Sequence, residues 1–191
     1  MFMQAFEIFV QARGLELRIT RYALFQSIFR VGEADHVDVV EGRALFDAFF
    51  STNVGAIEPA PGARDALATL APHATIVILT NAPAHSRQAR ARWLTDNGFP
   101  YPLLTNSGLK GPVVAALSAR TTGAAAFVDD LLPNLDSVAA EAPKVFRFQM
   151  VADERLRPLA PSAPHRHVRI DAWSALGPEI ARVLRIGEAG S

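Results

Sequence analysis

The chain has 191 residues, half of them hydrophobic, and its 19 basic residues balance its 19 acidic residues. This composition predicts a globular protein without an electrostatic bias toward nucleic acid or anionic membranes. The chain has no cysteine, no basic leader at its start and no apolar run near the ~20 residues of a membrane helix, so we expect a cytoplasmic protein without disulfides.

Residues 1–57 have the pattern of a small helical subdomain. Apolar residues recur at helical spacing within residues 2–10, 24–29 and 45–50, and Gly14 and Gly32 stand where helices would stop. Eight of the twelve phenylalanines lie in the first 50 residues. We interpret them as a packed helical core; the alternative is a pocket for an apolar substrate group.

From residue 58 to residue 191 the pattern is α/β. Short β-branched runs such as "TIVILTN" predict strands buried on both faces, and the segments between them predict helices. Strands are expected at 75–81, 101–106, 125–130, 144–150 and 167–171, and helices at 59–71, 86–98, 110–121, 135–142 and 172–184. This alternation predicts a parallel sheet with right-handed crossovers.

Polar residues follow the predicted strands where ligands bind in such sheets, beyond their carboxyl ends. They are Thr80, Asn81, Asp129 and Asp130, with Lys110 opening a helix between the two pairs. A hydroxyl, an ammonium and two carboxylates suit phosphoryl transfer, in which carboxylates hold Mg²⁺ and the lysine neutralises phosphate charge. Taken singly, each has a structural alternative: helix capping for Thr80 and the aspartates, and a solvated helix start for Lys110.

The order of these residues resembles the haloacid dehalogenase-like (HAD) hydrolase superfamily. "IVILTNAP" resembles its second motif at Thr80, "NSGLKGPVVAAL" its third at Lys110, and "FVDDLLPNLDSVAA" its fourth at Asp129 and Asp130, with Asn134 beyond them. The resemblance implies a Rossmann-like, three-layer parallel sheet with a small helical cap at residues 1–57. It also implies Mg²⁺ at Asp129 and Asp130, phosphate contacts from Thr80, Asn81 and Lys110, and a small phosphorylated substrate.

The chain departs from the family at the first motif, a strand ending in Asp-x-Asp that supplies the nucleophile and the general acid/base. Its upstream acids, Asp35, Asp38 and Asp47, lack that spacing after an apolar run. In the family this strand lies between those ending at Thr80 and Asp129. We favour a start assigned about a dozen residues late, given a strand of ~5 residues and its loop. The alternative is a genuine loss, leaving a non-catalytic protein that binds a phosphorylated ligand or a partner.

Two further groups are weaker candidates. Arg87, Arg90 and Arg92 could reach a substrate phosphate, although a solvated helix face is favoured. His165 and His167 share one side of an extended segment, but no third metal ligand stands near them. Substrate identity and oligomeric state have no signature in the sequence.

Overall fold

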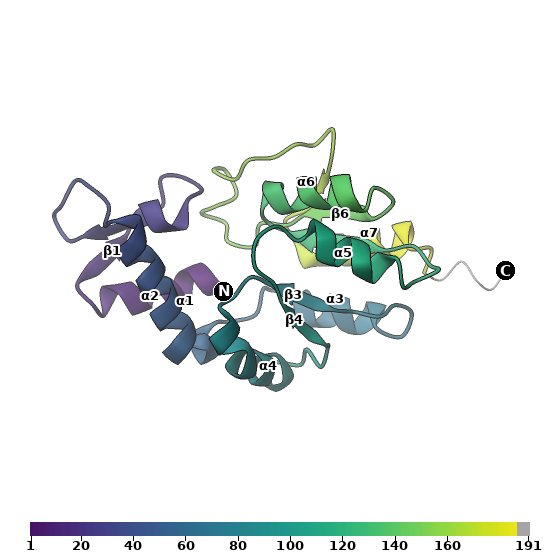
Figure 1. The fold of residues 1–191 in the computed structure, drawn as a ribbon, viewed down its shortest axis with the longest axis horizontal. Helices are drawn as coiled ribbons and strands as arrows, with labels where there is room; N and C mark the ends of the chain where they lie inside the picture. The colour runs from purple at the N-terminus through teal and green to yellow at the C-terminus, as the bar shows by residue number, and fades with distance from the viewer. Residues whose placement is uncertain (187–191) are drawn as a thin grey trace. The chain divides into compact units, whose positions relative to one another are not determined.

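Parallel β-strands alternate with α-helices from residue 63 onward, which is the mixed α/β pattern that the sequence predicts. The computed structural model describes residues 1–186, traced in Figure 1. From residue 63 onward the elements are, in chain order, α3 (Ala63–Leu70), β3 (Ile78–Thr80), η3 (Ala84–Ser86), α4 (Arg87–Asp96), β4 (Leu103–Thr105), α5 (Gly111–Ser118), β5 (Ala126–Asp129), α6 (Leu132–Glu141), β6 (Phe146–Gln149), β7 (Val168–Arg169) and α7 (Trp173–Val183). None of the helices within residues 1–186 is both long and apolar enough to cross a bilayer.

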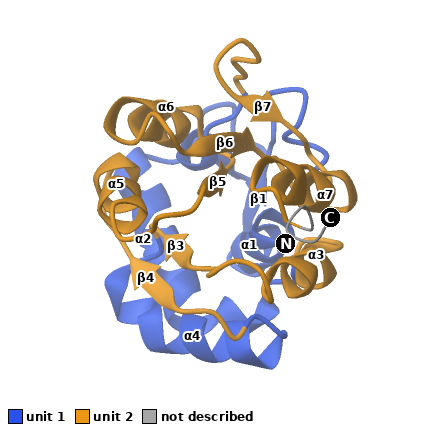
Figure 2. Ribbon diagram, turned by 90° about the vertical axis from the view of Figure 1, so that its right-hand side faces the viewer, with its two compact units in different colours: residues 1–59, 82–99, 153–160 blue, residues 60–81, 100–152, 161–191 orange. Residues whose placement is uncertain are grey.

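The chain divides into two units, coloured separately in Figure 2. Unit 1 consists of residues 1–59, 82–99 and 153–160, and unit 2 of residues 60–81, 100–152 and 161 onward. The sequence suggests a division into residues 1–57 and 58–191. The first segment of unit 1 ends close to that boundary, but α4 and the loop 153–160 also belong to unit 1.

The strands of unit 2 form two separate parallel sheets. β3 pairs with β4, with Ile78 opposite Leu103 and Thr80 opposite Thr105. The second sheet has the order β5-β6-β7. Within residues 1–186 no ladder joins β3 to β5. The break falls between the two strands that the resemblance expects to flank a missing strand.

Helices cover both faces of the β5-β6-β7 sheet. One face packs against α5 and α6, and the other against α3 and α7. The first cluster contains Val114, Phe127, Leu135, Val138, Ala142 and Val145, and the second contains Leu70, Phe148, Leu176 and Ile180. Leu79 of β3 packs against the first cluster, and Ile76, two residues before β3, packs against the second. β3 therefore lies between the same two helix layers as β5.

Unit 1 is built around phenylalanine rings. Its elements are α1 (Phe2–Gln11), β1 (Leu15–Leu17), η1 (Leu24–Ser27), β2 (Ile28–Arg30), α2 (Val39–Thr52), η2 (Val54–Ala56), η3 and α4. Six rings from α1 and α2 contact one another at centroid distances of 4.7–6.0 Å: Phe2, Phe6, Phe9, Phe46, Phe49 and Phe50. Phe6 and Phe49 are fully buried, so these rings form a packed core.

The expectation that residues 1–57 are purely helical is wrong for residues 15–30. There β1 and β2 form an antiparallel pair, with Leu15 opposite Arg30 and Leu17 opposite Ile28. The apolar spacing within residues 24–29 also fits one 3₁₀ turn followed by a strand. Ser27 ends that turn, because its hydroxyl donates to the Ala23 carbonyl and its own carbonyl accepts from the Arg18 N–H.

Candidate functional site

The carboxyl ends of β3 and β5 carry the polar residues that the sequence singles out. Thr80 is the last residue of β3 and Asn81 follows it, while Asp129 ends β5 and Asp130 follows. Lys110 stands directly before the first residue of α5. All five residues belong to unit 2, where hydrogen bonds and an ion pair connect the segments that carry them.

Lys110 and Asp129 form a buried ion pair. The Lys110 Nζ donates to Asp129 Oδ2 at 2.7 Å, and the two side chains are only 13% and 2% exposed. Each charge is stabilised by the other, because a buried charge without a partner has a large desolvation cost. The pair therefore fixes an ammonium at the carboxyl end of β5.

The second carboxylate oxygen of Asp129 organises the start of α6. Asp129 Oδ1 accepts from the Leu131 N–H at 2.9 Å and from Asn134 Nδ2 at 3.0 Å. Asn134 is buried, so hydrogen bonds connect Asp129 with the later residues of the fourth motif. α6 has no side-chain cap, so Asp129 is not a helix cap: its Oδ1 closes a turn onto Leu131, the residue before the helix, while Oδ2 faces the lysine.

The Asp130 side chain differs from that of Asp129 in its exposure to solvent. The residue is exposed, unlike Asp129, and its backbone carbonyl accepts from Gln149 Nε2 at 3.2 Å. The Gln149 amide is itself buried and also donates to the Pro161 carbonyl at 2.7 Å. The backbone at the end of β5 is therefore held by β6, and the Asp130 carboxylate stands at an open surface.

Asn81 links the end of β3 to the loop that leads into Lys110. Its Nδ2 donates to the Gly108 carbonyl at 2.9 Å, and its Oδ1 accepts from Asn106 Nδ2 at 3.0 Å. The Asn106 N–H also donates to the Thr80 carbonyl at 2.8 Å. These bonds place Thr80 and Asn81 at the same edge as Lys110 and Asp129.

Gly111 sets how closely α5, and with it Lys110, approaches α6. Its N–H donates to Ser137 Oγ at 3.1 Å. A Cβ on Gly111 would lie 2.3 Å from that oxygen and 2.5 Å from the Ser137 carbonyl oxygen. Only glycine fits this contact. The missing side chain at Gly111 therefore lets α5, and Lys110 directly before it, approach α6 closely.

The substitution Gly111→Ala is expected to lower the free energy of unfolding by about 2–3 kcal/mol, because α5 must move away from the α6 backbone. For a chain of this size that is a fall of roughly 5–10 °C in melting temperature, measurable by circular dichroism. Gly55→Ala is the control, since no atom lies within 4 Å of its added Cβ. Equal melting temperatures for the two variants would contradict the close contact.

Asn106, Ser137 and Gln149 belong to the site but were missed in the sequence. Asn106 had a signal: "LLTN" at the end of β4 repeats the Leu-Thr-Asn of "ILTN" at the end of β3. Adjacent parallel strands with the same ending bring their asparagines together. Ser137 and Gln149 had none, because their roles depend on how α6 and β6 pack.

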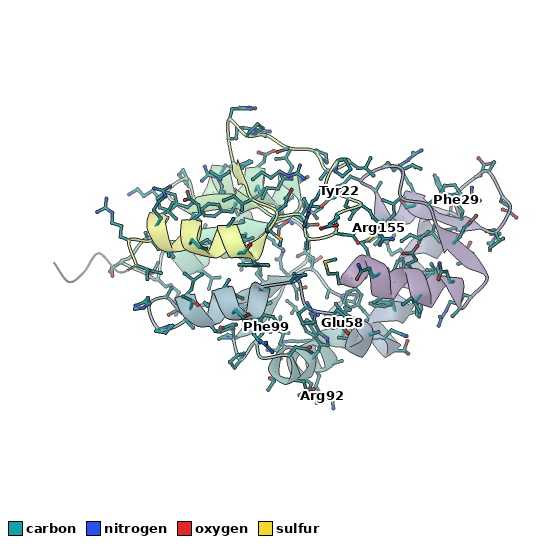
Figure 3. All side chains as sticks on the ribbon, turned by 180° about the vertical axis from the view of Figure 1, so that it is seen from behind. Tyr22, Phe29, Glu58, Arg92, Phe99 and Arg155 are labelled. Atoms are coloured by element: carbon teal, nitrogen blue, oxygen red, sulfur yellow. The ribbon has the colours of Figure 1, made fainter. Side chains whose placement is uncertain are left out.

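The arginines of α4 are not one solvated face. Arg87 and Arg92 are exposed, and Figure 3 labels Arg92 on the outer side of α4. The Arg90 guanidinium lies 4.1 Å from the Trp93 ring centroid, and its buried Nη1 has no hydrogen-bond partner. Burial lowers the pKa of Arg90 to about 10, so it stays charged at neutral pH. All three residues belong to unit 1.

Two of the remaining weaker candidates, His167 and Asp38, have structural contacts. His167 is buried and its Nε2 lies 2.8 Å from Asp136 Oδ1, whereas His165 is exposed. Asp38 caps α2 by accepting from the Val40 N–H at 2.7 Å. The other two upstream acids, Asp35 and Asp47, are exposed.

A metal ion at this edge would need ligands beyond the two aspartates. Within residues 1–186 no group of three or more His, Cys, Asp or Glu side chains is arranged to hold a metal. Carboxylates are the hard oxygen donors that Mg²⁺ prefers, but its octahedron takes ~6 oxygens. Asp129 and Asp130 therefore fit part of a magnesium site, which water, phosphate oxygens or a further carboxylate would complete.

Comparison with models of known protein families finds no match to this chain. A search of curated proteins also finds no match.

Proposed function

We propose that this chain is most of a Mg²⁺-dependent phosphohydrolase of the HAD type, acting on a small phosphorylated molecule. In this proposal unit 2 is a Rossmann-like core that lacks one strand, and unit 1 contributes the cap. The nucleophilic aspartate of the resemblance would come from that strand. The observation that carries the proposal is the ion pair of Lys110 with Asp129 at the carboxyl edge of the strands.

The residues of this edge divide into a phosphate part and a metal part. Lys110 keeps N–H donors beyond the one that binds Asp129, and its charge suits the equatorial oxygens of a phosphoryl group. Thr80 and Asn81 stand at the same edge with a hydroxyl and an amide. Asp130, exposed beside the buried Asp129, is the carboxylate best placed to meet an ion from solvent. When bound, Mg²⁺ would neutralise charge on the phosphoryl oxygens.

One observation favours a second candidate, a non-catalytic protein that binds a phosphorylated ligand. The only carboxylate that hydrogen-bonds Lys110 in the described part of the chain is Asp129, and it is held by Leu131 and Asn134 as well. A carboxylate so engaged is a poor nucleophile. Without a further aspartate the edge can bind phosphate and metal but cannot form an aspartyl phosphate.

The substitution Asp130→Asn is expected to weaken Mg²⁺ binding and to reduce the rise in melting temperature that Mg²⁺ gives the parent chain. The physical reason is that the ion relieves repulsion between neighbouring carboxylates and loses a charged ligand in the variant. With so few protein ligands we expect millimolar affinity in the parent, on the order of 4 kcal/mol. Titration calorimetry and thermal melts measure both quantities.

Asp65→Asn provides the control, because Asp65 is an exposed acid of the same unit with only a loose contact to Arg64. Its Mg²⁺ response should equal that of the parent. If Asp130→Asn also responds like the parent, the aspartate pair serves the start of α6 alone and the metal part of the proposal fails.

A further inference from the structure

Arg90 in α4 is a half-buried arginine without a carboxylate partner. Its Nη1 is buried and makes no hydrogen bond to any residue between 1 and 186. None of the ion pairs in that part of the chain includes Arg90 either. A buried charge without a counter-charge has a large desolvation cost, so this guanidinium favours binding of an anion.

Arg155, in the same unit, shows how a protein normally accommodates a partly buried arginine. Its guanidinium donates to Asp153 at 3.0 Å and to Glu7 at 2.6 Å, and these bonds raise the pKa of Arg155 above its ordinary value. For Arg90 the shift has the opposite direction, because burial alone acts on it and lowers its pKa to about 10. At neutral pH Arg90 is therefore charged, and no carboxylate of the described part of the chain neutralises it.

The Trp93 ring fixes the position of the Arg90 guanidinium, whose central carbon lies 4.1 Å from the ring centroid. Trp93 is itself held in place: it is buried, its Nε1 donates to the Ile57 carbonyl at 2.8 Å, and the Phe99 ring stacks on it with the centroids 6.2 Å apart. The ring covers one side of the guanidinium, whereas the N–H donors of a guanidinium lie in its plane. An acceptor in that plane can therefore bind without displacing Trp93.

The first turn of α4 increases the positive charge near Arg90. It contains no acidic residue, and Arg87 opens it. Arg87 is exposed and stands three residues before Arg90, on the same side of the helix. Arg90 is only half-buried, so part of the residue is open to solvent. A small anion that approaches from solvent can therefore meet two guanidinium groups, of which Arg90 is the one held in place.

We propose that Arg90 is the centre of an anion-binding site in unit 1, which takes a phosphate or carboxylate group of a small molecule and uses Arg87 as a second cation. Both groups present two oxygens that match the parallel N–H donors of a guanidinium. The anion supplies the counter-charge that residues 1–186 do not provide. This inference goes beyond the phosphohydrolase proposal and does not require it, because Lys110 and Asp129 belong to unit 2.

The emission of Trp93 gives a local readout of anion binding at Arg90. The chain has two tryptophans, and the substitution Trp173→Phe leaves Trp93 as the only one. In this background sodium phosphate and sodium acetate are titrated separately, with sodium chloride keeping the ionic strength constant. We expect a saturable change in Trp93 emission with half-saturation in the millimolar range. The oxyanion that binds more tightly identifies the group as a phosphate or a carboxylate.

The substitution Arg90→Met should weaken oxyanion binding by about tenfold or more, because a charge-assisted hydrogen-bonded pair is lost. Arg92→Met is the matched control, since Arg92 is exposed on the outer side of the same helix (Figure 3) and should respond like the parent. Without an oxyanion, Arg90→Met should melt no lower than the parent, because methionine removes an unpaired charge and keeps an apolar contact with Trp93. Thermal melts with and without phosphate give a second readout should the substitution itself alter Trp93 emission.

Either of two results would overturn the proposal: a response to both oxyanions no larger than that to chloride, or a full response retained in Arg90→Met. If the first is accompanied by a fall of more than about 3 °C in the melting temperature of Arg90→Met, Arg90 serves only to pack on Trp93. Phosphate that still stabilises Arg90→Met while Trp93 emission no longer responds would support the Arg90 site and report separate binding at Lys110. The proposed function and this inference can thus fail independently.

Discussion

The substitution Lys110→Met is expected to lower the free energy of unfolding by about 3–5 kcal/mol, because it leaves the Asp129 carboxylate buried without its cation. Methionine keeps most of the length and the apolar part of the lysine side chain, so the loss reports the charge. The side chains of Lys110 and Asp129 are 13% and 2% exposed, so water cannot solvate the Asp129 carboxylate in place of the ammonium. A loss of this size is a large part of the ~5–15 kcal/mol that stabilises a typical domain. Urea unfolding followed by circular dichroism measures it.

The chain offers a matched control, because its only other lysine, Lys144, is exposed. Lys144→Met should change the free energy of unfolding by less than about 0.5 kcal/mol. The double variant Lys110→Met/Asp129→Asn should recover part of the loss, since a neutral amide no longer needs a cation. If the double variant is less stable than Lys110→Met by the full cost of Asp129→Asn alone, the two residues are not energetically coupled and the ion pair has no stabilising role.

The local pattern of the sequence was sufficient to predict the order of elements in unit 2. Strand β5 and the helix after it follow from the apolar run of "AAFV" and the polar turn behind it. The edge carrying Thr80, Lys110 and Asp129 follows from parallel strands sharing a direction. β3, by contrast, was predicted over residues 75–81 and covers Ile78–Thr80. A strand requires a paired neighbour, and within residues 1–186 this segment pairs with β4 alone.

Other features depend on contacts that a pattern does not contain. The hairpin of β1 and β2 was missed because an apolar spacing of three and four residues also fits a turn that leads into a strand. The contact of Gly111 with Ser137 depends on the approach of two helices 26 residues apart in sequence. The two Asp129 oxygens bind Lys110 and Leu131 separately, and this likewise depends on how α5 packs beside β5.

Extending the chain upstream of Met1 is expected to change both stability and activity. If the strand of the proposed function precedes Met1 and pairs with β3 and β5, it would cover the half-buried side chains of β3 and add backbone hydrogen bonds. We expect a gain of about 3 kcal/mol, or roughly 10 °C in melting temperature for a chain of this size. Two open sheet edges also invite association, so the 191-residue chain should be the more aggregation-prone form in light scattering.

Activity should appear with the same extension if the upstream run ends in Asp-x-Asp, since the strand would then end beside Lys110 and Asp129. The 191-residue chain should not hydrolyse p-nitrophenyl phosphate, and the extended chain should do so in the presence of Mg²⁺. Replacing the first upstream aspartate by asparagine should reduce the rate by on the order of 10³-fold or more, the cost of losing a nucleophile. The melting temperature of that variant should stay near that of the extended chain, because its strand would still pair with β3 and β5.

The melting temperature tests the upstream strand, and the hydrolysis rate tests the phosphatase chemistry. A longer chain that melts higher and hydrolyses no phosphomonoester would keep the strand and leave the edge of Lys110 and Asp130 as a binding site. Activity that survives loss of both upstream aspartates would require another nucleophile, and the engaged Asp129 is poorly suited to that role. A stop codon before Met1, with a stable and monomeric 191-residue chain, would instead favour the non-catalytic function.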